Sequence, residues 1–199
     1  MSPSNATPLV DVVVKLGGGV LASVEAADAV LEALRSAAQL CRLLVVPGGG
    51  PFADVVRDID HRFGLSDDAA HWMAVLAMDQ HAHLMTGRLA DAEMVSEPRE
   101  IAGAIDAHRI PVLAPSRWLR AADPLPHSWD VTSDSIAAWV AGCVGARRLV
   151  LVKPAGVHAI DTVVDAYFSR ALPPNVSSLI VTTDRIDQLP AVISARTQG

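Results

Sequence analysis

The chain contains two lysines, Lys15 and Lys153, and each stands at the end of an apolar run with a glycine within three residues after it. All the other basic residues among the 16 are arginine. Lysines usually scatter over a solvated surface. A lysine ammonium is a compact charge suited to phosphate, and open α/β sheets bind ligands outside the carboxyl ends of their strands. The placement of the two lysines therefore predicts phosphate chemistry at such an edge.

Two glycine triplets, Gly17-Gly18-Gly19 and Gly48-Gly49-Gly50, each follow a short apolar strand pattern. Backbone N–H groups in a glycine turn at the start of a helix lack intrahelical partners and lie at the positive end of the helix dipole, so they bind anions. Either triplet alone is also compatible with a plain tight turn between a strand and a helix. Together with Lys15, the pair predicts two phosphate groups that face each other.

Two other nucleotide motifs fit less well. Residues 17–22 match the G-x-G-x-x-A dinucleotide fingerprint, but that fingerprint expects an acidic residue at the end of the next strand to bind a ribose. The next strand ends instead in Val46-Pro47-Gly48, without a carboxylate. A P-loop is excluded because no glycine run is followed by Lys-Ser or Lys-Thr. A dinucleotide oxidoreductase remains the third alternative.

Asp134 is the candidate carboxylate for orienting the lysines, because it follows Thr132-Ser133 at a predicted helix start and faces the same edge of the sheet. The alternative is an ordinary helix N-terminal aspartate, which the dipole alone favours. His71, with Trp72, is a candidate for the wall of the pocket. His71, His81 and His83 lie on one predicted helix, residues 67–84, but their spacing does not place them on one face, so no metal site is predicted.

Length and composition limit the remaining choices. A chain of 199 residues with 51% hydrophobic content predicts one domain over residues 10–199 after a flexible segment 1–9. A net charge of −6 argues against a nucleic-acid surface. No apolar run reaches the length of a membrane span and no signal sequence is visible, so we expect a cytoplasmic protein without a membrane partner.

Strand and helix patterns alternate along the chain, which predicts a three-layer α/β/α sandwich with a mostly parallel central sheet. Residues 86–95 fit neither pattern clearly, and the segment 115–129, rich in proline and tryptophan, is expected to be a loop. Strands are predicted near residues 12–16, 43–46, 110–114, 149–152 and 179–181, and helices near 24–38, 51–63, 67–84, 97–107, 133–144, 165–170 and after 184.

The chain resembles the amino acid kinase family. Lys15-Leu16-Gly17-Gly18-Gly19 resembles the family's first phosphate-binding motif, and residues 46–52 resemble its second. Residues 48–57, 77–79, 127–135 and 164–168 are similar to the branch that phosphorylates an aminomethylfuranmethyl phosphate in methanofuran biosynthesis. The likeness extends over about residues 10–170.

The resemblance implies an ATP-dependent phosphotransferase that uses Mg²⁺, acts on a small phosphorylated acceptor and assembles as a homo-oligomer. Lys15 would stabilise the transferring phosphoryl group, and Asp134 would hold the lysine. Arg57 would meet the acceptor's phosphate. The implied nucleotide and phosphate site comprises Gly17, Gly18, Gly19, Lys153 and Gly156, and the implied acceptor site comprises Gly48, Gly49, Gly50, Arg57, His71 and Ser133.

The chain departs from the family pattern in its nucleotide half. Where the family reads Thr-Asp-x-Asp-Gly, this chain reads Lys153-Pro154-Ala155-Gly156, and the following segment is shorter than in the family. The segment that carries the family's second lysine is missing, so Lys153 is expected to take over its role as a third catalytic residue. The alternative function is a non-catalytic subunit that binds a phosphorylated metabolite after loss of the nucleotide site.

Overall fold

The computed structural model describes residues 8–21, 23–157 and 163–195. Its six strands form one sheet in the order β3-β4-β2-β1-β5-β6, and all neighbouring strands are parallel. The sheet confirms the predicted α/β class. The strands are β1 (Val12–Leu16), β2 (Leu43–Pro47), β3 (Ala92–Val95), β4 (Ile110–Leu113), β5 (Arg148–Lys153) and β6 (Ser177–Thr182).

The central strand β1 is buried along its whole length, as a parallel strand covered on both faces must be. Its side chains alternate between two separate hydrophobic cores. Val13 belongs to one core, whereas Val12 and Val14 belong to the other. Leu16 is in register with Pro47 of β2 and with Val152 of β5, so the three strands end at the same edge. This register brings Lys15, Gly48 and Lys153 to one place.

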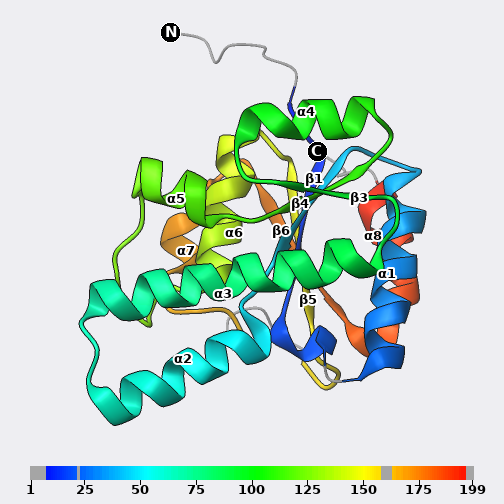
Figure 1. Cartoon of the computed structure of the whole chain (residues 1–199). Coiled ribbons are helices and arrows are strands. Elements are labelled where there is room, and N and C mark those ends of the chain that lie inside the picture. Colours follow the sequence, from blue (N-terminus) through cyan, green and yellow to red (C-terminus); the bar gives the residue numbers. More distant parts are fainter. Residues whose placement is uncertain (1–7, 22, 158–162, 196–199) are drawn as a thin grey trace, which may run out of the picture.

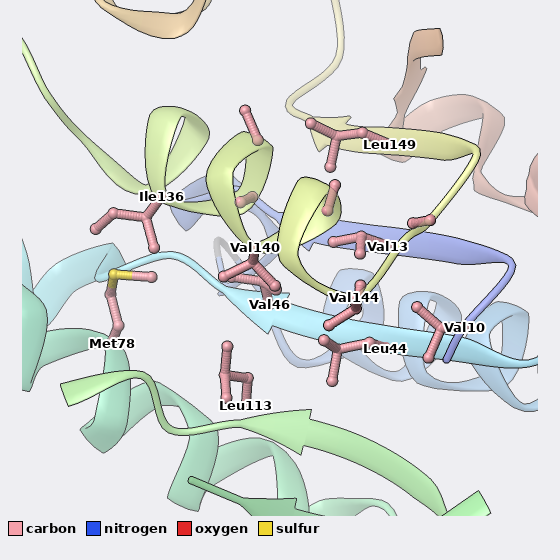
Figure 2. Close-up of a cluster of buried hydrophobic side chains, with 14 of the residues drawn as sticks. Val10, Val13, Leu44, Val46, Met78, Leu113, Ile136, Val140, Val144 and Leu149 are labelled. Carbon is pink, nitrogen blue, oxygen red and sulfur yellow. The ribbon is translucent and has the colours of Figure 1, made fainter. Parts of the chain in front are cut away.

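Helices cover both faces of the sheet (Figure 1). On one face, Val140 of α6 (Ser133–Cys143) and Val144, which follows this helix, pack over Val13 of β1 and Leu44 of β2 (Figure 2). The same core includes residues of α4 (Pro98–Asp106), α5 (Ser116–Ala122) and α7 (Phe168–Ala171). The opposite core is built from α1 (Val24–Ala38), α8 (Leu189–Ser194) and the 3-10 helix η3 (Thr183–Gln188).

The long helix α3 (Asp67–Arg88) contributes to both cores. Val75 and Met78 pack in the core that contains α6, whereas Ala82 and Met85, nearer the end of α3, pack in the core that contains α1. It follows α2 (Gly50–Phe63) as the second arm of a helical pair beside the sheet (Figure 1). Because α3 passes from one core to the other, it forms a wall along the edge where the glycine triplets lie.

Local side-chain caps fix the starts of several helices as the sequence indicates. Ser23 accepts a hydrogen bond from the Ala26 N–H at 3.1 Å, and Ser66 accepts one from the Ala69 N–H at 3.3 Å. The α2 helix differs because its first cap residue is Gly49, which has no side chain to offer. The first N–H groups of α2 therefore remain available to a ligand.

In two segments the structure adds an element that the sequence did not predict. Residues 86–95, which fit neither pattern clearly, include β3 at the edge of the sheet, and the expected loop 115–129 contains the helix α5. The predicted flexible segment 1–9 lies outside the described residues except for Pro8 and Leu9. The Leu9 N–H donates to the Val144 oxygen at 3.0 Å. Among the helices that the structure describes, none is long and apolar enough to cross a membrane.

Candidate active site

A cavity of about 320 Å³ opens at the carboxyl ends of β1, β2 and β5. Its volume lies within the range of small-molecule sites. The walls come from α2, α3, the start of α6 and the segment 128–132. The structure brings together in this lining most of the residues singled out in the sequence, namely Lys15, Gly18, Gly19, Gly49, Gly50, Arg57, His71, Ser133, Asp134 and Lys153.

Asp134 lies between the two lysines. The Lys153 Nζ donates a hydrogen bond to Oδ2 of Asp134 at 2.7 Å, and the Lys15 Nζ lies 2.7 Å from Oδ1. All three side chains are at least 90% buried. One carboxylate therefore contacts both amines in the cavity lining, and its role in orienting them stays a prediction.

The two lysines are held to different degrees. Lys153 also donates to the Val163 oxygen at 2.7 Å, so two acceptors fix its amine. Lys15 has only the ion pair with Asp134 among the described residues, and that pair lacks the geometry of a good hydrogen bond. Since an ammonium carries three N–H donors, Lys15 retains donors for an incoming anion.

The charges of Lys15, Asp134 and Lys153, here called the lysine–aspartate trio, act on each other strongly. Burial lowers the pKa of Lys15; the Asp134 carboxylate opposes that shift, and the neighbouring Lys153 adds to it. Burial alone would raise the pKa of Asp134, but the charges of Lys15 and Lys153 outweigh it and hold this pKa below its ordinary value. Asp134 is therefore ionised, and one carboxylate faces two amines. A bound phosphate would add negative charge beside them.

The two glycine turns approach each other so closely that side chains would not fit. A Cβ on Gly18 would lie 2.9 Å from the Cα of Gly50, and a Cβ on Gly48 would lie 2.9 Å from the Ser133 Oγ. Gly50 also has a φ of 55°, in the left-handed region that favours glycine. The turns thus present backbone to the cavity, which is what close approach to a phosphate requires.

An arginine and a tryptophan also line the cavity. The Arg57 guanidinium lies 4.9 Å from the ring centroid of Trp129, and its Nη1 donates to Asp54 at 2.8 Å. The Trp129 indole donates to Asp60 at 2.7 Å. These contacts bridge α2 and the segment 128–132, and Arg57 adds a second kind of cation to the lining that contains Lys15.

His71 lines the cavity as part of an aromatic cluster. Its ring stacks on His127 with centroids 4.1 Å apart, and Trp72 meets both rings edge-on. The two ring nitrogens of His127 lie 2.5 Å from Asp68 and 2.9 Å from Asp123. His127 therefore ties the start of α3 to the segment that follows α5.

Asp165 is the residue whose role the sequence did not indicate. Its Oδ2 accepts from the N–H and hydroxyl of Thr132 at 2.9 and 2.7 Å and from the Ser135 N–H at 3.0 Å, and its Oδ1 accepts from the Ser135 hydroxyl. Asp165 thereby fixes the first turn of α6, which carries Asp134. A local sequence pattern cannot indicate that a residue caps a helix 30 residues away, as Asp165 does for Ser135. Asp165 does lie within one of the motifs that carry the family resemblance.

Three of the singled-out glycines lie outside the lining. The N–H of Gly17 donates to the Val152 oxygen at 2.9 Å, and that of Gly48 donates to the Leu16 oxygen at 2.8 Å, so both tie their turns to the sheet. Gly156 lines a separate cavity of about 180 Å³ beside β6 and η3. The structure thus separates Gly156 from the two lysines' cavity.

The donor set suits phosphate groups and does not suit a metal held by the protein. Buried amines and free backbone N–H groups bind anions. Within the described residues, no group of three or more His, Cys, Asp or Glu side chains could hold a metal ion. The site carboxylate Asp134 is already occupied by two lysines. Any Mg²⁺ would therefore be carried by the phosphates of a nucleotide.

Comparisons with known proteins agree with this geometry. The chain is 28% identical over 141 residues to the [5-(aminomethyl)furan-3-yl]methyl phosphate kinase of Methanocaldococcus jannaschii, covering 70% of this chain but only 63% of that protein. A uridylate kinase from Archaeoglobus fulgidus has the same fold, with a TM-score of 0.67 at 17% identity over 91% of this chain and 95% of that one. The UMP kinase of Ureaplasma parvum matches with a TM-score of 0.65 at 15% identity, over 88% and 91% of the two chains. The profile of the amino acid kinase family matches residues 12–158, and the chain belongs to that family.

Proposed function

We propose that the chain is an ATP-dependent phosphotransferase whose acceptor is a small phosphorylated molecule. The observation that carries the proposal is the Lys15–Asp134–Lys153 trio, which lies in one cavity with two glycine turns. Such a site can neutralise phosphate charge from several sides without supplying a nucleophile of its own. That is the requirement of phosphoryl transfer, in which catalysis is positioning and charge stabilisation.

The residues divide the work in the following way. Lys15, which keeps free donors, stabilises the phosphoryl group in transit, and Lys153 holds the donor phosphates. Asp134 keeps both amines in place. An oxygen of the acceptor phosphate attacks the γ-phosphorus of ATP, the bond to the β-phosphate oxygen breaks, and ADP leaves with that bond's electrons. The product is a diphosphate.

The proposed acceptor is a furanmethyl phosphate like the one in the name of the M. jannaschii relative. Its phosphorylation would be a step in the synthesis of a methanofuran-type one-carbon carrier. Arg57 would bind its phosphate, with the N–H groups of Gly49 and Gly50 at the start of α2. His71 and Trp129 supply ring faces suited to a flat aromatic body. The acceptor therefore occupies the end of the cavity between α2, α3 and the segment 128–132.

The donor nucleotide uses the side of the site next to β5. Gly18, Gly19 and Lys153 would hold its phosphates. The separate cavity that contains Gly156 is bordered by Thr182, Asp184 and Arg185, which offer polar contacts to a nucleoside. Donor binding thus depends on the Lys-Pro turn that replaces the two carboxylates of the family pattern.

Replacement of Lys15 tests the proposed chemistry. With ATP, Mg²⁺ and synthetic [5-(aminomethyl)furan-3-yl]methyl phosphate, phosphorus NMR should show formation of a diphosphate. We expect Lys15→Met to lower kcat by about a hundredfold to a thousandfold, the usual effect of removing one group that stabilises transition-state charge. Arg99→Met, on the exposed face of α4, is the matched control and should keep wild-type turnover. Equal rates for Lys15→Met and wild type would refute the assigned mechanism.

A binding subunit without catalytic activity is the second candidate, because the chain lacks the carboxylates of the family's nucleotide motif and spans 63% of its relative. Calorimetric titration with Mg·ATP distinguishes the two functions. We expect the enzyme to bind nucleotide and Lys153→Ala to lose that binding. Tight binding of the furan phosphate without any nucleotide binding would favour the binding subunit.

A further inference from the structure

His81, in the middle of α3, is a completely buried histidine that the proposed chemistry does not use. Its Nδ1 lies 2.5 Å from the carbonyl oxygen of Gly48. A carbonyl oxygen can only accept a hydrogen bond, so Nδ1 carries the proton. In the neutral ring Nε2 is then a bare acceptor, and it has no hydrogen-bond partner in the described part of the chain. One tautomer of His81 is therefore selected by the second glycine turn.

The contact sets the direction of the next N–H group. The Gly48 carbonyl and the Gly49 N–H belong to one planar trans peptide, in which they point in opposite directions. His81 holds the carbonyl towards α3, and the ring does not line the large cavity, whereas Gly49 does. The Gly49 N–H consequently points away from the His81 ring, and Gly49 itself lines the cavity. It makes no hydrogen bond to any group in residues 8–21, 23–157 or 163–195.

The charges around His81 favour the same neutral ring. Burial lowers the pKa of His81; its hydrogen bond to Gly48 opposes this shift, while the positive charge of Lys15 adds to it. The other charged group bordering the small space beside the ring is Arg88, which is paired with Asp28. Protonation would place a second buried cation near Lys15, so the ring stays uncharged at neutral pH.

We propose that His81 is a positioning residue that locks the Gly48–Gly49 peptide with its N–H directed at the phosphate of the bound substrate. The inference rests on the proposed function for the identity of that substrate, but the anion-binding role can be measured without turnover. A glycine turn has many accessible conformations, and a turn that must present a donor in one direction needs an anchor. His81 supplies the anchor from the side opposite to the ligand.

The tautomer can be read directly in the wild-type protein. Long-range ¹H–¹⁵N correlation spectra of histidine-labelled protein at neutral pH should show His81 as the neutral ring protonated at Nδ1. A ring protonated at Nε2 would overturn the proposal, because such a ring cannot donate to Gly48. This measurement needs no variant and no substrate.

The anchoring role is tested with inorganic phosphate as the probe and the Gly49 amide resonance as the reporter. Phosphate should shift that resonance in the wild type, and His81→Leu should weaken phosphate binding by roughly tenfold or more, as expected for one hydrogen bond to a charged group. His81→Asn should restore most of the affinity, because its amide nitrogen can donate to Gly48 in place of Nδ1. His83→Leu, exposed on the same helix, is the matched control.

The outcomes separate this inference from the proposed function. If wild-type protein shows no phosphate-dependent shift at Gly49, or if His81→Leu binds phosphate as tightly as wild type, the positioning role is wrong. Phosphate binding that is tight in the wild type, nearly as tight in His81→Asn and weak in His81→Leu would support the positioning role of His81. The same result without any turnover of the furan phosphate would contradict the kinase proposal. If the protein turns over the furan phosphate, His81→Leu should lower kcat/KM and His81→Asn should recover it. A folding defect without a positioning role would instead lower the free energy of unfolding of both variants.

Discussion

At the scale of single residues, the site is organised by a carboxylate that serves two amines. Asp134 has no solvent to compensate for the loss of either partner, since its side chain is 5% exposed. The lysine positions could be predicted from the sequence, because a cation at the end of a buried parallel strand points to the ligand edge of the sheet. The role of His81 could not, since it depends on a contact across 33 residues with a backbone carbonyl.

Replacement of Asp134 by asparagine should destabilise the folded protein. The change leaves two buried amines without a counter-charge, and breaking a buried ion pair in this way costs about 3–5 kcal/mol. Urea denaturation at neutral pH measures the loss in the free energy of unfolding. Asp187→Asn, an exposed aspartate in η3, is the matched control and should change stability little. A similar effect for the two variants would show that the trio contributes no more than a surface charge.

His127 should give the folded protein a pH-dependent stability. The hydrogen bond to Asp68, with a further contribution from Asp123, raises the pKa of His127 above the ordinary histidine value of 6.5. The charged histidine therefore stabilises the folded state fully below pH 6.5, and this contribution disappears as the pH rises through the raised pKa. Thermal unfolding between pH 5.5 and 9 should show this decline, and His127→Gln should flatten it. An identical pH profile for the two proteins would contradict the assignment.

At the scale of elements, two helix starts depend on carboxylates that lie far away in the sequence. Asp165 caps α6, and Asp79 of α3 accepts from the N–H of Ser116 at 3.1 Å and from its hydroxyl at the start of α5. Helices with local caps, such as α1 and α3, could be predicted from the sequence. The helix α5 could not, because its cap residue is Pro115 and the carboxylate that replaces a local cap is 37 residues away.

Removal of the Asp165 carboxylate should affect both the stability of α6 and the activity. Asp165→Ala leaves the N–H groups of Thr132 and Ser135 without their acceptor, and we expect a loss of more than about 2 kcal/mol. Ser23→Ala, which removes one local cap from α1, should cost about 1 kcal/mol and leave turnover unchanged. Chemical denaturation and the phosphorus NMR assay provide the two readouts. A loss no larger than that of Ser23→Ala would argue against a special role for Asp165.

At the scale of the whole molecule, α3 links the two cores that the sheet separates. Val75 and Met78 pack with α6, and Ala82 and Met85, further along the helix, pack with α1. The alternation of strands and helices was enough to predict the layers. It does not indicate a helix shared between them, because the residues that face the two cores lie on successive turns of the same helix.

The shared helix predicts that the two cores unfold together. Met78→Ala and Met85→Ala remove side chains from different cores, and each should cost about 2–5 kcal/mol. Both variants should still unfold in a single transition, with the same midpoint by circular dichroism and by tryptophan fluorescence. Met94→Ala, at an exposed position of β3, is the control. Separate transitions in either variant would show that the cores are independent.

The burial of both lysines also determines how the protein reacts with chemicals that modify amines. Lys15 is 4% and Lys153 is 8% exposed, and the chain has no other lysine. Acylating reagents therefore find no side-chain amine on the surface, and the lysine amines open to them are those of the ligand cavity. Apart from the chain's α-amino group, a small acylating dye would consequently label only lysines of the binding pocket, and any molecule that fills the pocket would protect these two side chains from the dye.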